Sequence, residues 1–430
     1  MSIALLAALV IFILIFLLRM PIAFGMIASA AIYLIIEGQD LGLAINLIVN
    51  TYYINFIIIA VPLFMFTDNV MNSGKVTDMI FTFANALCGR IRGALGQVNI
   101  LGSLIFSGMT GSAIADAEGL GKIEMAAMKS NGFDDAFSCS ITAASATLGP
   151  VFPPSIPLVI YAMLSGTSVG ALFMGGMVPA ILLTIALMVY VAIVSRIRNY
   201  PRSPRFRIRA LVALTIRAIP SLLTPLILLA GIFTGLLTPT EAGAIAGLYA
   251  ILISIFAYKS LSPKEFWNIV KASIQDIGSA SIIIGAAAII SYIIAREGIP
   301  TSLATWFMAV SSNKYLFLLL VNIGILILGM FIDTSTIQLI FVPILFPVAR
   351  ALGINMVHFG LVVTFNMMIG LLTPPFGMLL FITSSLSGTP LKAIVKEILW
   401  PLVAMIVVLI IITYIPDTVL FLPRAAGLLP

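Results

Sequence analysis

Two short stretches of the chain place glycines, hydroxyl side chains and acids inside otherwise apolar surroundings. The first runs from Ser107 to Ser112 and is followed by Asp116 and Glu118, and the second runs from Gly329 to Thr336. Carbonyls freed by a broken helix and Ser or Thr hydroxyls are oxygen ligands that suit a hard cation such as Na⁺, whereas half-helix N-termini attract anions. Asp116 and Glu118 are two residues apart and would point in different directions on a helix, so we expect helix-start residues rather than an acid–base pair.

Each stretch has a partner break that is rich in Gly and Pro, at Thr147–Pro154 and at Gly370–Pro375. Non-helical backbone at membrane depth is costly unless it is buried in protein or lines a cavity. We therefore predict one cation site per half. The first combines Ser103, Ser107, Gly108, Thr147, Gly149 and Pro150, and the second combines Gly329, Ser335, Thr336, Gly370, Thr373 and Pro374. The alternative is that the hydroxyls only bond to helix carbonyls and the prolines only kink helices.

The composition is that of a membrane protein. The 430 residues are 61% hydrophobic and only 9% charged, whereas a soluble protein carries about 25% charged residues. Apolar runs recur from Ile3–Leu18 to Leu399–Ile415, and each spanning helix needs about 20 such residues. The first run lacks the preceding basic region and cleavage site of a signal peptide, so we expect it to be retained. We predict an all-α polytopic membrane protein with roughly 11 spanning helices and two re-entrant hairpins.

Several function classes are disfavoured by what the chain lacks. His358 is its only histidine, and Cys88 and Cys139 lie in unrelated segments without metal-site spacing. The stretch Gly119–Lys122 lacks the first glycine of a phosphate-binding loop and is followed by Ile where Ser or Thr is needed. We therefore expect that the protein is not an enzyme and binds no organic cofactor.

A basic segment marks the middle of the chain. Between Ser195 and Arg217 there are seven arginines and no acid. Positively charged loops stay in the cytoplasm, so this segment predicts a cytoplasmic linker rather than a nucleic-acid site.

The linker separates two halves that share a repeat. A shift of 221 positions takes Gly108-Met109 to Gly329-Met330, Gly149 to Gly370, and Pro153-Pro154 to Pro374-Pro375. We therefore expect a first repeat at 1–195, a linker at 196–217 and a second repeat at 218–430, as in secondary transporters. If the repeats are inverted, both termini lie outside the cytoplasm. The expected parts are interfacial arms at about 76–92 and 259–276, hairpins at about 94–128 and 315–350, and broken helices at about 136–163 and 356–386.

Three motifs resemble a known family. They are Ser107-Gly-Met-Thr-Gly-Ser-Ala-Ile-Ala-Asp116, Pro153-Pro-Ser-Ile-Pro-Leu-Val-Ile160 and Gly231-Ile-Phe-Thr-Gly-Leu-Leu-Thr-Pro-Thr-Glu-Ala242. They look like the large membrane subunit of TRAP (tripartite ATP-independent periplasmic) transporters, over the whole chain. The resemblance implies an elevator fold in the bacterial inner membrane and Na⁺-driven import of carboxylates such as sialic acid or C4-dicarboxylates. It also implies a separate four-helix membrane subunit and a periplasmic substrate-binding protein as partners. Sialic acid is slightly favoured, on the resemblance alone.

The charged residues have both structural and functional interpretations. Arg296 follows an apolar run, where it either marks a helix end or grips a carboxylate with two hydrogen bonds, and the resemblance favours the carboxylate anchor. Asp333 either caps a helix or polarises the second tip, pairing with Arg296 or lying near a Na⁺ site. Glu241 lies in a capping-box pattern after Thr238 and is a weaker substrate candidate. The remaining substrate candidates are the tip residues Thr110, Ser112 and Thr334.

Two rival functions remain open at this level. A stand-alone Na⁺-coupled dicarboxylate or ion transporter would share the repeats but need no binding protein. An intramembrane aspartyl protease would need Asp333 together with a second catalytic aspartate. Asp116 is the nearest option, and no protease-type motif surrounds it.

Overall fold

The computed structural model describes residues 2–18, 20–72, 75–88, 91–202 and 208–429. Every regular element among these residues is a helix, apart from an isolated bridge between Arg92 and Arg202. The predicted all-α fold is therefore confirmed. The linker was expected at 196–217, but one helix ends at Ile197 and the next begins at Ile208, so much of the expected linker is helical. Arg205 and Arg207 of that linker lie outside the described residues.

The first half contains eleven helices among the described residues. They are α1 (Ile3–Leu17), α2 (Ile22–Ile36), α3 (Gly42–Ile54), α4 (Ile57–Met71), α5 (Lys75–Cys88), α6 (Ala94–Thr110), α7 (Ala113–Glu118), α8 (Leu120–Ser130), α9 (Asp135–Ala146), α10 (Ile156–Ser165) and α11 (Val169–Ile197).

The second half repeats much of this order and adds two π-helical turns. Its elements are α12 (Ile208–Phe233), α13 (Pro239–Leu252), η1 (Ile253–Ala257), α14 (Pro263–Arg296), α15 (Ile299–Val310), α16 (Lys314–Gly329), α17 (Thr334–Thr336), η2 (Ile337–Phe341), α18 (Val342–Ala351), α19 (Met356–Gly370), α20 (Met378–Ser387), α21 (Leu391–Tyr414) and α22 (Asp417–Ala425).

Many of these helices are suited to a bilayer. In the described part of the chain, six helical segments are long and apolar enough to cross a membrane, and α3 and α4 together form a seventh candidate bent by 73°. Eight further apolar helices have 10–17 residues, which is the length of half-spans. The chain is therefore a multi-pass membrane protein.

The hairpins and broken helices lie where the sequence predicts them. The first hairpin is formed by α6 and α7–α8, and the second by α16 and α17–η2–α18. The broken helices are α9/α10 and α19/α20, and the proline pairs Pro153-Pro154 and Pro374-Pro375 lie in their breaks. Glycine and proline both disfavour continuation of a helix, so local chemistry accounts for these boundaries.

The predicted second arm, at about 259–276, is wrong as a separate element. A capping box between Ser262 and Glu265 starts α14 there, and that helix continues without interruption to Arg296. The helix that precedes hairpin 2, as α5 precedes hairpin 1, is α15. The basic residues of 259–276 resembled an interfacial helix, but α14 continues past them, through Gly278 and Gly285, and no proline follows Pro263 until Pro300.

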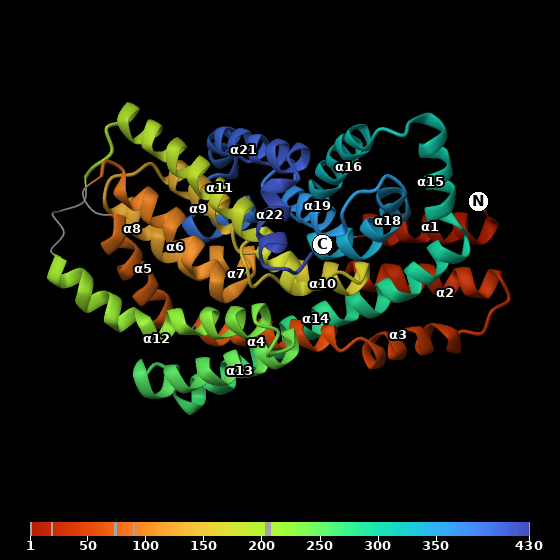
Figure 1. Cartoon of the computed structure of the whole chain (residues 1–430), viewed down its shortest axis with the longest axis horizontal. Coiled ribbons are helices and arrows are strands. Elements are labelled where there is room, and N and C mark those ends of the chain that lie inside the picture. Colours follow the sequence, from red (N-terminus) through yellow and green to blue (C-terminus); the bar gives the residue numbers. More distant parts are fainter. Residues whose placement is uncertain (1, 19, 73–74, 89–90, 203–207, 430) are drawn as a thin grey trace.

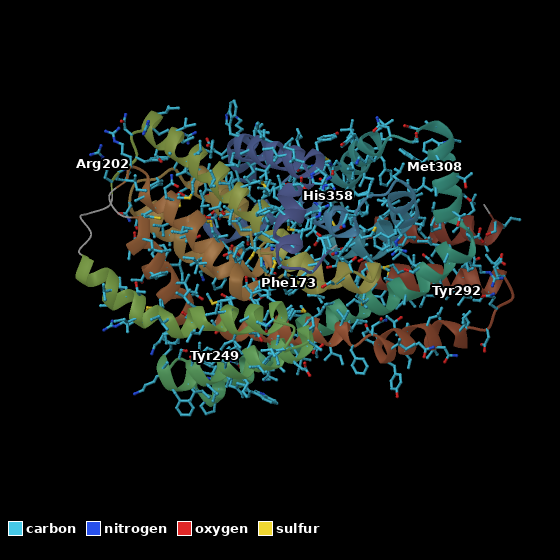
Figure 2. The ribbon with its side chains drawn as sticks, in the orientation of Figure 1. Phe173, Arg202, Tyr249, Tyr292, Met308 and His358 are labelled. Atoms are coloured by element: carbon cyan, nitrogen blue, oxygen red, sulfur yellow. The ribbon has the colours of Figure 1, made fainter. Side chains whose placement is uncertain are left out.

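The helices are arranged in two bodies. Along the lower side of Figure 1 lie α3, α4, α12, α13 and α14, and with α1 and α2 they form one body, in which α4 packs against α13 and α14. We call these seven helices the scaffold. Above them lie both hairpins, both broken helices, α11, α21 and α22, which we call the hairpin body. Its core is filled by fully buried aromatic side chains, including Phe137, Tyr161, Phe173 and Phe359 (Phe173 is labelled in Figure 2).

Two short helices connect these bodies at their edges. The α5 helix packs against α6 of the hairpin body and against α12 of the scaffold. The α15 helix packs against α18 of the hairpin body and against α14 of the scaffold. Each of these two helices therefore contacts both bodies.

Candidate functional site: paired hairpin tips and helix breaks

The first tip lies directly on the first break. Gly111 ends α6 with φ +58°, and a Cβ added to it would lie 2.5 Å from the carbonyl oxygen of Pro154. A Cβ on Gly149 would lie 3.2 Å from the carbonyl carbon and oxygen of Ser112. Glycine is therefore required on both sides, because backbone meets backbone. Ser112 then starts α7 by accepting a hydrogen bond from the Ala115 N–H at 3.3 Å.

The second tip also lies directly on the second break. A Cβ on Gly370 would lie 2.7 Å from Cα of Gly329, and the reverse addition would give 2.9 Å. After this contact Asp333 caps α17, accepting hydrogen bonds from the Thr336 N–H at 3.0 Å and the Thr336 hydroxyl at 2.6 Å. The structure thus brings the predicted tip and break of each half together.

The predicted hydroxyl ligands are partly engaged with helix carbonyls. Ser107 donates to the Leu104 carbonyl at 2.7 Å, Thr147 to that of Ala144 at 2.6 Å, and Thr373 to that of Ile369 at 2.7 Å. Ser103 donates instead to the Ser145 hydroxyl at 3.2 Å. These bonds use the hydroxyl protons, so oxygen lone pairs remain able to accept a cation. Both the structural and the ion-binding interpretations therefore fit these side chains.

The other predicted site residues take several positions around the tips and breaks. In the first half, a Cβ on Gly108 would lie 3.4 Å from Cβ of Pro225, and the Pro150 carbonyl accepts a hydrogen bond from the Ser155 hydroxyl. In the second half, Thr334 and Ser335 are half-buried in α17, and Pro374 lies in the break.

A small cavity touches the first tip. It has a volume of about 10 Å³ and is lined by Thr67 of α4, by Thr110 and Gly111 of the tip, and by Pro154 of the break, among others. Thr110 is 2% exposed, and its buried hydroxyl has no hydrogen-bond partner within the described residues. A space of this size holds one water-sized species. The cavity therefore lies where scaffold, tip and break meet.

Each hairpin also packs against the broken helix of the opposite half. Gln338 of η2 donates a hydrogen bond to the Pro157 carbonyl of α10 at 2.6 Å. Arg350 at the end of α18 donates to the Ser165 carbonyl at 3.0 Å. In the other direction, α7 packs against α20. Both tip–break pairs therefore belong to one packed unit.

Arg296 has partners of its own in the scaffold. Its guanidinium donates to the Tyr292 hydroxyl at 3.1 Å and forms an ion pair with Glu37 at 3.6 Å, at the end of α14 marked by the Tyr292 label in Figure 2. No ion pair joins Arg296 to Asp333 in the described part of the chain. The helix-end interpretation thus has a geometric basis, while the substrate role of Arg296 stays a prediction.

Glu241 forms the expected capping box. Its carboxylate accepts hydrogen bonds from the N–H and the hydroxyl of Thr238, both at 2.8 Å, and its own N–H donates to that hydroxyl at 3.3 Å. The side chain is exposed. Its capping interpretation is confirmed, and a substrate role stays a prediction.

Sequence reasoning missed a set of buried acids around hairpin 1. Asp68 on α4 and Glu124 on α8 are 4% and 1% exposed, and Asp116 in the first turn of α7 is 1% exposed. Neither oxygen of Asp116 or Glu124 has a hydrogen-bond partner among the described residues. Asp116 is a helix-start residue as predicted, but it is buried between helices. The missed signal was Asp68 inside the apolar stretch Ile57–Met71, because intramembrane acids are functional candidates by default.

Comparisons with known proteins place this arrangement in context. Residues 9–418 match the family described as tripartite ATP-independent periplasmic transporter, DctM component. The chain is 40% identical to the sialic acid TRAP transporter large permease protein SiaM of Vibrio cholerae, covering 94% of this chain and 95% of the relative. It is 37% identical to the C4-dicarboxylate TRAP transporter large permease protein DctM of Pseudomonas aeruginosa, with 94% of each chain covered.

Two further comparisons extend the range. An isethionate TRAP transporter permease protein, DctMQ of Oleidesulfovibrio alaskensis, is 32% identical over 93% of this chain and 63% of its own length. Among solved structures, the YdaH transporter of Alcanivorax borkumensis superposes with a TM-score of 0.62 at 13% identity, covering 85% of this chain and 86% of that one. This last likeness concerns the fold alone. The relatives are named as permeases and transporters, not as enzymes.

Proposed function

Since the chain belongs to the DctM-component family of tripartite ATP-independent periplasmic transporters, we propose that it is the large subunit of a Na⁺-coupled importer of an organic acid anion. The family membership confirms the resemblance seen in the sequence. Beyond the family membership, we propose that transport is coupled to Na⁺, that the substrate is an organic acid, and that the hairpin body moves against the scaffold.

The observation that carries Na⁺ coupling is the paired contact between tip and break. In each half, glycines bring two interrupted backbones within contact distance, and hydroxyl oxygens lie beside them. Interrupted helices of this kind supply carbonyl oxygens to Na⁺ in transporters. The proposed cation sites are those predicted from the sequence, around Ser107 and Gly149 in the first half and around Gly329 and Gly370 in the second.

The proposed substrate site lies between the two tips. Each tip carries a helix N-terminus, capped by Ser112 in α7 and by Asp333 in α17, and such termini favour an anionic group. Thr110 and Thr334 supply hydroxyls nearby. Arg296 and Glu241 are proposed to contact substrate only in another position of the hairpin body, because their side chains now serve helix ends.

The proposed motion is an elevator movement of the hairpin body against the scaffold. It is supported by the division into two packed bodies with α5 and α15 at the edges. The proposed partners are a separate four-helix membrane subunit and a periplasmic binding protein, in the bacterial inner membrane, with the linker in the cytoplasm and both termini in the periplasm. Sialic acid is the first acid to test and a C4-dicarboxylate the second, since relatives with those names match at 40% and 37% identity.

Uptake into proteoliposomes tests the proposal. The chain is reconstituted with its small subunit and binding protein, and labelled sialic acid and succinate are compared with and without an inward Na⁺ gradient. We expect uptake of one acid, only with the Na⁺ gradient. Uptake indifferent to Na⁺ would remove the coupling, and full uptake without the binding protein would favour a stand-alone transporter.

A pair of variants separates the two interpretations of Arg296. Arg296→Ala removes both the ion pair and any substrate contact, whereas Glu37→Gln removes the ion pair only. If Arg296 anchors the substrate, Arg296→Ala abolishes uptake and Glu37→Gln retains it. Equal loss in both variants would assign Arg296 to the scaffold alone.

A further inference from the structure

An apolar hollow lies beside the second hairpin. It has a volume of about 300 Å³, opens to the surface and is lined by residues of α15, α16 and the η2–α18 segment. Apart from Gly324, its lining residues carry hydrocarbon or aromatic side chains. The largest of them are Trp306, Phe307, Phe317 and Phe341. This hollow lies outside the tips and breaks assigned to transport.

Water is a poor occupant of this space. Water in a protein cavity needs two to four polar partners, and an apolar cavity of about 150 Å³ stays dry and takes up benzene or xenon instead. The helices around the hollow also present apolar surface outward, with Trp306 60% and Leu320 48% exposed. In a multi-pass membrane protein such side chains face lipid, so the medium beside the hollow is acyl chain.

Basic side chains lie at one end of the same hairpin. Lys314 begins α16 and lies three and seven residues before Phe317 and Val321, which places all three on one helix face. Lys314 is exposed and makes no ion pair within the described residues, although its ammonium lies 5.2 Å from the centre of the Tyr315 ring. Arg350 ends α18 at the same, open end of the hairpin. A long lysine side chain reaches from the apolar region to headgroup level.

We propose that this hollow binds one acyl chain of an anionic phospholipid whose phosphate lies at Lys314. The apolar lining binds the acyl chain, and the Lys314 ammonium binds the anionic headgroup. Because α15 connects the hairpin body to the scaffold, the bound lipid fills the space between that connection and hairpin 2. This site is independent of the transported substrate and of Na⁺.

Tryptophan fluorescence provides the test, because a brominated acyl chain quenches an indole that it contacts. The chain has three tryptophans. A full-length variant with Trp267→Phe and Trp400→Phe, studied in detergent, keeps Trp306 in the hollow as its single tryptophan. The matched control leaves only Trp400, which is 68% exposed on α21 outside the hollow. Brominated phosphatidylglycerol is titrated against both proteins, with brominated phosphatidylcholine as the uncharged-headgroup comparison.

We expect quenching of Trp306 to saturate and quenching of Trp400 to rise without saturation. Gly324→Leu should remove the saturable part, because a Cβ there meets no atom within 4 Å and the new side chain would occupy the hollow. Gly324→Ala is the milder variant if the leucine variant fails to fold, and it should weaken saturation. Lys314→Gln should weaken phosphatidylglycerol binding about five-fold and leave phosphatidylcholine unchanged, which is the contribution of one lysine near an anionic lipid.

Three results would overturn the proposal. The first is equal, unsaturable quenching of Trp306 and Trp400, which would mean contact with bulk lipid only. The second is saturable quenching that survives a folded Gly324→Leu variant. The third is a Lys314→Gln variant that binds both lipids like the unmodified chain.

Discussion

Replacing Gly370 by alanine tests the contact between tip and break most directly. The added methyl carbon would lie 2.7 Å from Cα, 3.0 Å from the carbonyl carbon and 3.2 Å from the carbonyl oxygen of Gly329. Non-bonded carbons prefer a separation of about 3.5–4.0 Å. All three atoms belong to the backbone of α16, so no side chain can rotate away. The second tip and break must therefore move apart by about 1 Å.

The expected size of the effect follows from overpacking. Forcing a methyl group into a close-packed contact costs about 1–3 kcal/mol. Gly324→Ala is the matched control, because Gly324 lies within α16, the helix that Gly370 contacts, and a Cβ added there would meet no atom within 4 Å. Gly324→Ala should raise the unfolding free energy by up to about 1 kcal/mol, because alanine has the higher helix propensity. If the same carbonyls hold Na⁺, a loss of 1–3 kcal/mol corresponds to roughly 5- to 150-fold weaker Na⁺ binding.

Thermal unfolding in detergent measures both effects. Sodium chloride is exchanged for choline chloride at constant ionic strength, and the Tm is followed for the unmodified chain and both variants. We expect Na⁺ to raise the Tm of the unmodified chain and of Gly324→Ala by mass action. Gly370→Ala should have a lower Tm and a diminished response. If Gly370→Ala matches Gly324→Ala in Tm and in Na⁺ response, the steric reasoning is refuted.

Three further outcomes are expected. Asp116→Asn should raise the Tm, because neither oxygen of the buried Asp116 carboxylate has a hydrogen-bond donor. As a control, Asp135→Asn, at an exposed ion pair, should change the unfolding free energy by less than about 0.5 kcal/mol. A lower Tm for Asp116→Asn would show that the charge of Asp116 is compensated. The hydroxyl of Ser2 donates to Glu297 and holds the pKa of that carboxyl below its ordinary value of 4.5. The stabilisation from this hydrogen bond is therefore present above pH 4.5 and is lost on acidification through the lowered pKa. The Tm measured as a function of pH should show this loss in the unmodified chain and not in Glu297→Gln. Arg198→Ala removes contacts at 2.9 Å to two carboxylates and should lower the unfolding free energy by about 1 kcal/mol, and an unchanged denaturation midpoint would contradict this.

The elements that the sequence predicts well are those set by local chemistry. Both hairpins and both broken helices lie within a few residues of their expected bounds, because the glycine and proline clusters that end them act on adjacent backbone. The caps of Asp333 and Glu241 were predictable for the same reason: donor and acceptor are three residues apart. The meeting of each tip with its break was also expected, since the repeat places glycines at Gly329 and Gly370 as it does in the first half.

The parts that sequence reasoning missed depend on distant contacts. The ion pair between Arg296 and Glu37 joins helices far apart in the chain, and no local pattern identifies such a partner. The burial of Asp116 and Glu124 depends on how hairpin 1 packs against its neighbours. The second arm was misplaced because charge composition alone does not reveal whether a helix stops, and no proline lies between Pro263 and Pro300 to end this one.

The uninterrupted course of α14 has a consequence for the bilayer itself. A helix of 34 residues is about 51 Å long at 1.5 Å per residue, whereas the hydrocarbon core is about 30 Å thick. The equivalent stretch of the first half is divided into α3 and α4 by a 73° bend, so the described residues of the first half contain no helix of this length. Such a rod must tilt strongly or extend beyond the hydrocarbon, and its lysine-bearing first turns suit the headgroup layer. Its inclination, and with it the transport rate, is therefore expected to vary with acyl-chain length.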